Sequence, residues 1–276
     1  RRRHSFPTRR SSDLQSLSLG GLTYGVTNME LTSAYASIAN GGTYQKPVLY
    51  TKVVDHNGNI LLSNTQKGKR VMKESTAFLL TDAMKDVITK GTGKSAKLSS
   101  SMAVAGKSGT TSNSYDYWFS GYTPYHTASV WMGYDKNTNF ASDNTHKKIW
   151  AKVMNEIIKT KQEQTTDFKK PADIVKAKVC KESGKLAIKG VCDHDPRGSR
   201  VITEYFEKGT VPTQTCDIHV AVEVCKTSDK LATKNCPANK KQRKIYIVRK
   251  KGSHGKTADT PYMLPKKYQS VFCKKH

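Results

Sequence analysis

Apolar residues recur at helical spacing in three stretches of the chain. In the first, Thr27 stands three residues before Glu30, which is the spacing of a capping box, and apolar positions follow at intervals of three and four until Gly41-Gly42. The second stretch runs from about 75 to 90 and the third from about 145 to 159. We therefore expect three amphipathic helices, because a period near 3.6 residues puts these apolar positions on one side.

The expected buried faces follow from the same spacing. The second helix should bury Leu79, Leu80, Ala83, Met84 and Val87. The third carries an apolar stripe made of Ile149, Trp150, Val153, Met154, Ile157 and Ile158. A stripe of that width is typical of a helix that packs on the face of a sheet.

Strand-like runs lie between these helices. The segment 51–62 predicts a hairpin, since Asn57-Gly58 suits a type I′ turn between two apolar runs. Three further strands are expected at 102–111, 117–122 and 127–134. The short polar turns between them indicate an antiparallel meander.

Composition divides the chain further. Residues 161–172 are polar and include Pro171, which predicts a linker between a first domain at 15–160 and a second at 173–276. All the cysteines lie in the second part, which indicates a small stapled module after a cysteine-free domain. They are Cys180, Cys192, Cys216, Cys225, Cys236 and Cys273.

An internal repeat brackets four of these cysteines. KVCKESGKLAIKGVC (178–192) matches EVCKTSDKLATKNC (223–236), and each copy predicts a strand, a polar turn and a return strand. Bridges Cys180–Cys192 and Cys225–Cys236 would each stabilise the fold by about 2–3 kcal/mol. The sequence does not fix the connectivity, because six cysteines allow fifteen pairings.

A metal site is the alternative use of these cysteines. Cys216 and His219 would offer a ligand pair, but no second pair at zinc spacing accompanies them, so we expect no metal and no other cofactor. The histidines form no cluster with acids at a useful spacing, and none is assigned a role.

The net charge of +25 calls for a polyanionic neighbour or a solvated surface. No zinc finger, RNP-like stretch or helix-turn-helix is visible, so we expect no nucleic acid partner; anionic wall polymers or lipid headgroups explain the same charge. Residues 237–276 carry many lysines and arginines and predict a solvated, partly disordered tail around a strand-like stretch at 245–248. No apolar run approaches the roughly 20 residues of a membrane-spanning helix.

The first fourteen residues read RRRHSFPTRRSSDL and have no hydrophobic period. From His4 to Leu14 they resemble the translation of a sequencing adapter. We expect residues 1–14 to be an artefact and the sequence that preceded Gln15 to be missing.

The segment 104–111 (VAGKSGTT) carries the strongest candidate chemistry. Lys107 supplies a cation, and Gly109 lacks a Cβ, so that a ligand can lie along the strand. The hydroxyls of Ser108, Thr110 and Thr111 complete a set suited to a carboxylate. The aromatics that follow are expected mostly to pack strands: Tyr115, Tyr117, Trp118, Trp131 and Tyr134.

Four blocks together resemble the transpeptidase domain of class A (bifunctional) penicillin-binding proteins. They are LGGLTYGVTNMELTSAYASIANGG (19–42), STAFLLTDAMKDVITKGTG (75–93), VAGKSGTTSNSYDYWFSGYTP (104–124) and ASVWMGYD (128–135), and they follow the family's order. SGKLA and EYFEKGTVPTQTC (204–216) resemble a carboxy-terminal extension of some members. The resemblance implies an α+β fold, an incomplete serine β-lactamase-like transpeptidase with an antiparallel sheet and flanking helices, followed by a small cysteine-bearing β module.

The implied reaction is acyl transfer between peptidoglycan stem peptides, a reaction that β-lactams block. A serine attacks the penultimate D-Ala carbonyl, D-Ala leaves, and an amine resolves the acyl-enzyme. By resemblance, Lys107, Ser108 and Gly109 form the catalytic strand. Lys107 would favour the donor's carboxylate and help the proton traffic, and Ser108 would hydrogen-bond that carboxylate or the proton-shuttling network. Thr110 and Thr111 would bind substrate, and the Thr110 backbone N–H would form half of the oxyanion hole. The parent would also be a glycosyltransferase, at the outer face of the cytoplasmic membrane, anchored by a segment missing here.

The family's other motifs, S-x-x-K and S-x-N, are absent from residues 15–106. Matching letters at 142–144 and 253–256 lie downstream of Lys107, which is the wrong order, so we reject both. We expect this fragment to be inactive alone. The competing hypotheses are a non-enzymatic, cationic wall-binding module and a serine β-lactamase.

Overall fold

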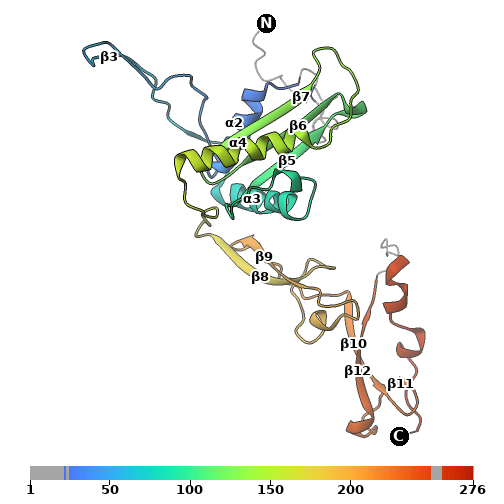
Figure 1. Ribbon diagram of the computed structural model, residues 1–276. Coiled ribbons are helices and arrows are strands. Elements are labelled where there is room, and N and C mark those ends of the chain that lie inside the picture. Colours follow the sequence, from blue (N-terminus) through green and yellow to red (C-terminus); the bar gives the residue numbers. More distant parts are fainter. Residues whose placement is uncertain (1–21, 23–24, 250–256, 276) are drawn as a thin grey trace. The chain divides into compact units, whose positions relative to one another are not determined.

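The computed structural model describes Leu22, residues 25–249 and residues 257–275, in two compact units that meet at Pro171 and Ala172 (Figure 1). Each unit is considered by itself. Residues 1–14 and 253–256 lie outside the described residues. The expected linker is largely packed on the first unit, since Asp167 pairs with Lys85 at 2.8 Å and Phe168 stacks edge-on against Tyr122.

The three expected helices are confirmed as α2 (Asn28–Ala39), α3 (Glu74–Thr89) and α4 (Thr145–Lys161). The capping box of α2 is formed as well. The Thr27 hydroxyl accepts from the Glu30 N–H at 3.2 Å, and the Glu30 carboxylate accepts from the Thr27 N–H at 2.8 Å. The backbone leaves the helix through Gly41 and Gly42, whose φ values of 59° and 86° favour glycine.

The expected meander is also confirmed, as β5 (Ala105–Thr110), β6 (Asp116–Tyr122) and β7 (Thr127–Gly133) in that spatial order. All pairs are antiparallel, and β5 pairs with β6 along its whole length without a bulge. Successive side chains of β6 therefore alternate between two buried layers.

On one face, α4 packs against the sheet through Trp150. Its indole is fully buried and meets Phe119 edge-on at 5.2 Å, and its Nε1 donates to the Ala128 carbonyl at 3.0 Å. The predicted stripe was too wide. Ile149 and Val153 are 43% and 46% exposed, because the contact with the sheet covers only the arc around Trp150.

On the other face, α2 and α3 pack around Tyr122. The Tyr122 hydroxyl is hydrogen-bonded to the Thr81 hydroxyl at 2.8 Å inside the core. Here the predicted face of α3 was partly wrong, since Leu80 and Ala83 are exposed. A hydroxyl that finds a buried partner can occupy a core position that an apolar pattern assigns to aliphatic residues. The buried side of α3 consists of Ser75, Ala77, Thr81, Met84 and Ile88.

A hairpin of β2 (Lys52–Val54) and β3 (Ile60–Ser63) forms where expected and is exposed on both strands. The type I′ turn was wrong, because only Gly58 in its loop has a positive φ, at 86°. The Asp55 carboxylate instead accepts the N–H groups of Asn57 and Asn59. Shorter pieces complete the described chain: β1 (Thr43–Tyr44) with β4 (Lys69–Arg70), and the 3-10 turns Lys94–Ala96, Ser112–Ser114, Cys192–His194, Ala238–Lys240, Thr257–Tyr262 and Lys266–Tyr268.

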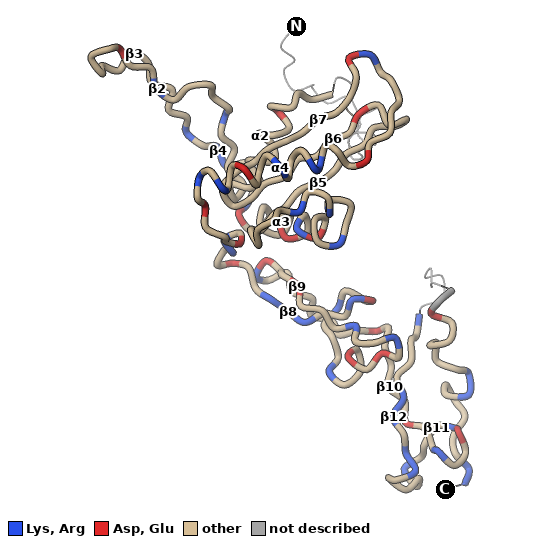
Figure 2. Tube along the Cα trace, viewed as in Figure 1, with Lys and Arg blue, Asp and Glu red and all other residues tan. Residues whose placement is uncertain are grey.

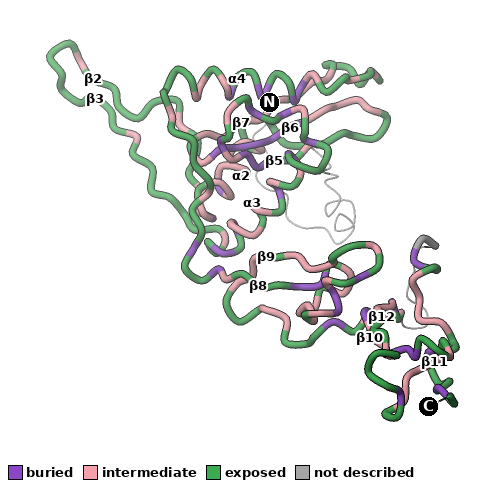
Figure 3. The backbone as a smooth tube through the Cα atoms, turned by 60° about the horizontal axis from the view of Figure 1, so that its bottom comes forward, coloured by how far each residue is buried: buried purple, intermediate pink, exposed green. Residues whose placement is uncertain are grey.

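The second unit is built from a two-stranded and a three-stranded antiparallel sheet. Strand β8 (Ile174–Cys180) pairs with β9 (Val201–Glu207). Strand β10 (His219–Cys225) lies between β11 (Lys230–Leu231) and β12 (Lys241–Ile247). The strand-like stretch expected at 245–248 forms the end of β12, which begins earlier than predicted and pairs with β10 along its whole length. Burial in this unit is patchy, in short purple segments rather than one continuous core (Figure 3).

Replacing Trp150 tests this account of the first unit. We expect Trp150→Ala to lower the free energy of unfolding by about 3–5 kcal/mol, because a fully buried ring leaves a cavity. The matched control, Ile149→Ala on the same helix, should cost less than about 1 kcal/mol. Urea unfolding followed by far-ultraviolet circular dichroism measures both, and equal losses would contradict the packing described.

Candidate functional site

Lys107 stands on the edge strand of the meander. Strand β5 pairs with β6 on one side, and no other described strand pairs with it on the other. The Lys107 side chain is exposed, and its ammonium donates to the carbonyl of Ser108 at 2.7 Å. An extended ligand can add to such an edge through backbone hydrogen bonds.

Two tryptophans flank the same stretch of strand. The register places Trp118 opposite Gly109 and Trp131 opposite Trp118, on the sheet face that carries Lys107. The rings lie 6.3 Å apart, and the Trp131 Nε1 donates to Asp116 at 2.8 Å. A cation, a bare stretch of backbone and a half-exposed aromatic wall therefore share one face. Tyr117 and Tyr134 instead pack against Phe140, as expected for strand aromatics.

The alternation of β5 puts Ser108 on the opposite face from Lys107. Its Oγ is hydrogen-bonded to the Thr92 Oγ1 at 2.9 Å. This bond ties the candidate strand to the segment that follows α3. The sequence did not predict this role of Thr92, because nothing in the sequence after a helix end indicates which distant residue a threonine contacts.

The two threonines after Gly109 differ in what they offer. The Thr110 side chain is exposed. The Thr111 hydroxyl donates to the Asp116 carboxylate at 3.1 Å and accepts from the Asp116 N–H at 2.9 Å. Its single O–H is therefore committed to closing the turn between β5 and β6.

The two glycines of β5 have different reasons to be glycine. A Cβ on Gly106 would lie 2.8 Å from the Phe119 ring and 2.9 Å from the Ser120 carbonyl, so packing requires its absence. A Cβ on Gly109 would meet only the Trp118 Cβ at 3.5 Å, an ordinary contact. A Cβ at Gly109 would therefore fit the fold, and the strand carries no side chain at this exposed position.

A second lysine lies near this strand. Lys147, in the first turn of α4, is buried and donates to the Asn144 side chain at 2.8 Å. Burial, and then the positive charge of Lys107, lowers the pKa of its ammonium. Sequence reasoning missed it because lysines on a helix usually mark the solvated face. The rejected motif at 142–144 directly precedes α4, and its Ser142 hydroxyl is hydrogen-bonded to His146 at 3.1 Å.

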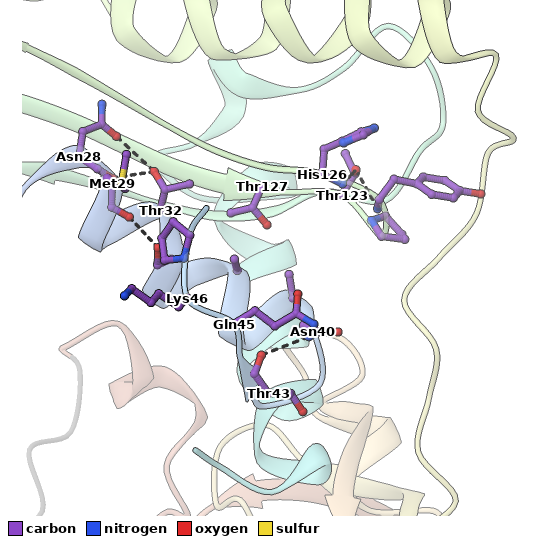
Figure 4. A pocket seen from close by; sticks show the side chains of 16 residues that line it. Asn28, Met29, Thr32, Asn40, Thr43, Gln45, Lys46, Thr123, His126 and Thr127 are labelled. Atoms are coloured by element: carbon purple, nitrogen blue, oxygen red, sulfur yellow. Dashed lines mark hydrogen bonds between the residues drawn. The ribbon is translucent and has the colours of Figure 1, made fainter. Parts of the chain in front are cut away.

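A hollow of about 630 Å³ lies elsewhere in the first unit, between α2 and the turn that joins β6 to β7 (Figure 4). Thr32, Lys46 and His126 are among the residues on its walls. Because Thr127 pairs with Tyr122 and Gly109 with Trp118, the hollow opens at the other end of the strands from Gly109. We place the candidate chemistry on β5, where the cation and the exposed edge are.

The six cysteines of the second unit are all buried and unbonded in the structure, and the Cys180–Cys192 and Cys225–Cys236 bridges stay predictions. Each predicted pair is joined by a third cysteine from outside its repeat. Cys216 and His219 have no second pair at zinc spacing in the sequence, but the fold brings two distant cysteines to them. The end of β8 and the return segment after it bring Cys180 and Cys192 to them.

Comparison with known proteins agrees with this architecture. The penicillin binding protein transpeptidase domain family matches residues 3–159, and the penicillin-binding protein 1A C-terminal domain family matches residues 170–221. The crystal structure of penicillin-binding protein 1A from Haemophilus influenzae is similar, with a TM-score of 0.55 and 23% identity over 69% of this chain and 33% of that one. This likeness confirms the expected transpeptidase fold.

Curated relatives include penicillin-binding protein 1A of Clostridium botulinum strain Langeland, 36% identical over 92% of this chain, and that of Clostridium novyi, 32% identical over 93%. The matches cover 31% and 29% of those two proteins. The chain thus spans about a third of the length of the relatives that it matches.

The lowered pKa of Lys147 has a measurable consequence. A lysine whose pKa is lower in the folded state makes stability fall as the pH drops below the ordinary lysine value of about 10.4. Lys147→Met should therefore be more stable than the parent near pH 8, by a margin that shrinks as the pH approaches that value. Urea titrations at several pH values measure the margin. The control is Lys152→Met, at an exposed lysine of the same helix, and parallel curves for the two variants would refute the assignment.

Proposed function

The chain belongs to the penicillin-binding protein transpeptidase family, and from that premise we propose that it is part of a peptidoglycan D,D-transpeptidase whose strand β5 binds the donor stem peptide. The observation that carries the proposal is Gly109, an exposed glycine on an edge strand that packing does not require. It sits beside the exposed cation Lys107.

The donor peptide would add to the free edge of β5 as a further strand. Its terminal carboxylate would meet the ammonium of Lys107, with Lys147 adding positive potential from the start of α4. The exposed hydroxyl of Thr110 would donate to the same carboxylate or to the proton network. The indole of Trp118, on the strand next to β5, would lie nearer to the methyl groups of the D-alanines than Trp131, which is one strand further from that edge.

The chemistry is acyl transfer. A serine oxygen adds to the carbonyl of the penultimate D-Ala, the peptide bond to the terminal D-Ala breaks, and the released amine takes a proton. An amine from a second stem peptide then displaces the serine. The Thr110 N–H would stabilise the oxyanion in both steps, an interaction worth about 2.7–4 kcal/mol of barrier per donor. A β-lactam would enter by the same route and remain as an acyl-serine.

The serine itself has no candidate in residues 15–106, where neither S-x-x-K nor S-x-N occurs. We propose that another part of the transpeptidase supplies both motifs and that this chain alone forms no acyl adduct. Every helix among the described residues is too short or too polar to cross a membrane. Action at the outer face of the cytoplasmic membrane, beside a glycosyltransferase domain, is proposed for the whole protein.

The charge supports an additional binding role. Lysine and arginine recur along the described trace of both units (Figure 2), within a net charge of +25. A cationic module that binds anionic wall polymer would hold the enzyme near its substrate. Salt-sensitive retention of the chain on purified cell walls tests this role, and no retention at low salt would remove it.

The transpeptidase proposal is tested on a chimera in which residues 15–276 follow the preceding part of the Clostridium botulinum relative. We expect Lys107→Ala to slow acylation by a fluorescent penicillin about 100-fold or more, since it removes a preorganised cation. Lys152→Ala, at an exposed lysine of α4, is the control and should react at the parent rate. Equal rates for the two variants would refute the role of Lys107.

Gly109 gives a separate test that distinguishes ligand approach from folding. Gly109→Ala should leave the free energy of unfolding within about 0.5 kcal/mol of the parent and still slow acylation about 100-fold, because it pushes the ligand off the strand. Gly106→Ala should lower stability, since its Cβ would overlap Phe119. If Gly109→Ala acylates normally, β5 does not bind the donor as proposed.

A further inference from the structure

Three buried cysteines and one buried histidine of the second unit gather around a common point. The sulfurs of Cys180, Cys192 and Cys216 and one ring nitrogen of His219 all lie within 4.8 Å of one another. The His219 Nδ1 is 3.4 Å from the Cys180 Sγ and 3.3 Å from the Cys216 Sγ. A tetrahedral Zn²⁺ with ordinary bond lengths separates a thiolate sulfur from an imidazole nitrogen by about 3.5 Å. We propose that these four side chains form a structural zinc site with three thiolate ligands and one imidazole ligand.

The environment of His219 supports a ligand role. Its other nitrogen, Nε2, lies 2.7 Å from the Asp195 Oδ2, and both side chains are fully buried. A histidine that donates from Nε2 to a carboxylate presents a bare lone pair at Nδ1, the form that binds a metal. Asp195 is itself held by Arg197, whose Nε and Nη2 donate to it at 2.9 and 2.7 Å.

The backbone also donates to the sulfur atoms. The Ile188 N–H points to the Cys192 Sγ at 3.3 Å, and the Thr233 N–H points to the Cys236 Sγ at the same distance in the second repeat. Donors aimed at sulfur stabilise a thiolate more than a thiol. In each copy of the repeat, a backbone N–H therefore donates to the sulfur of the second cysteine.

The fold repeats this arrangement as a whole. Cys180 ends β8 and Cys225 ends β10, and each strand pairs over seven residues with a later strand. A third cysteine is delivered identically in the two copies. The Cys216 N–H donates to the Leu186 carbonyl at 2.8 Å, and the Cys273 N–H donates to the Leu231 carbonyl at 2.8 Å.

The second copy gathers Cys225, Cys236 and Cys273, all buried, with their sulfurs within 4.8 Å of one another. By the same chemistry, these three cysteines would hold a second zinc ion.

Disulfides fit these clusters poorly. Each cluster holds three cysteines, so one bridge within a cluster leaves a buried thiol without a partner. Zn²⁺ uses all three, and the thiols release up to three protons to solvent as they bind it. Buried sulfur and imidazole ligands in a closed tetrahedron favour Zn²⁺ over Mg²⁺ or Ca²⁺.

Metal analysis of the full chain tests the proposal independently of any transpeptidase activity. Purified with reductant and desalted, the chain should carry two zinc ions. Metal-free chain titrated with Co²⁺ alone should show the thiolate charge-transfer and ligand-field bands of tetrahedral cobalt. If the chain carries one zinc ion, which is retained in Cys225→Ser and lost in His219→Ala, the first site is supported and the second is refuted.

Substitutions around the first site separate ligation from folding. Asp195→Asn should weaken zinc binding about 10–100-fold in competition with a chelating dye. His219→Cys should retain zinc through four thiolates, whereas His219→Ala should lose one ion. The control, His194→Ala at an exposed histidine of the same module, should bind as the parent does.

Two outcomes would overturn the proposal. One is a chain without stoichiometric metal whose cysteines are found paired by mass spectrometry when no reductant is present. The other is zinc that remains at full stoichiometry in both His219→Ala and Cys180→Ser, because ligands elsewhere would then hold it.

Discussion

The unbroken pairing of β5 with β6 is the constraint on which the first unit depends. It sets which residues of β5 face α4 and which face α2, so that Lys107 and the position of Gly109 fall on one face and Ser108 on the other. A slip by one residue would invert every one of these positions. Packing on the α4 face fixes this register, because Gly106 and Gly121 leave room there for the rings of Phe119 and Trp150.

The same packing leaves one edge of the sheet open. Buried aromatic packing on both sides of β6 fixes the sheet, while β5 keeps one edge that no described strand pairs with. In the proposed function, the cation of Lys107 and the bare backbone at Gly109 would recognise the ligand at this edge. Lys147 is buried in the first turn of α4, and burial lowers the pKa of its ammonium. In the proposed function it would add positive potential near Lys107.

The second unit is organised on a different principle. Its most buried clusters are made of cysteines with only a few small or aliphatic neighbours, so hydrophobic burial alone gives each strand pair little stability. The strand pair occurs twice, and three cysteines converge at each copy. Each copy therefore has its own cluster of potential metal ligands. A bound metal at each point would supply the free energy that a core of this size lacks.

The sequence by itself determined the elements that depend on local patterns. The capping box of α2, the three helices, the meander and the Lys107-Ser108-Gly109 strand were all predicted, because periodicity and backbone chemistry act over a few residues. Tertiary structure decided what depends on neighbours distant in the chain. It buried Thr81 in place of Leu80, because the Tyr122 hydroxyl offers a partner from another strand. It brought Cys180 and Cys192 to Cys216 and His219, although the spacing of these residues in the sequence does not match a zinc motif. Convergence of side chains in space is set by strand pairing over long separations, and a linear pattern carries no record of it.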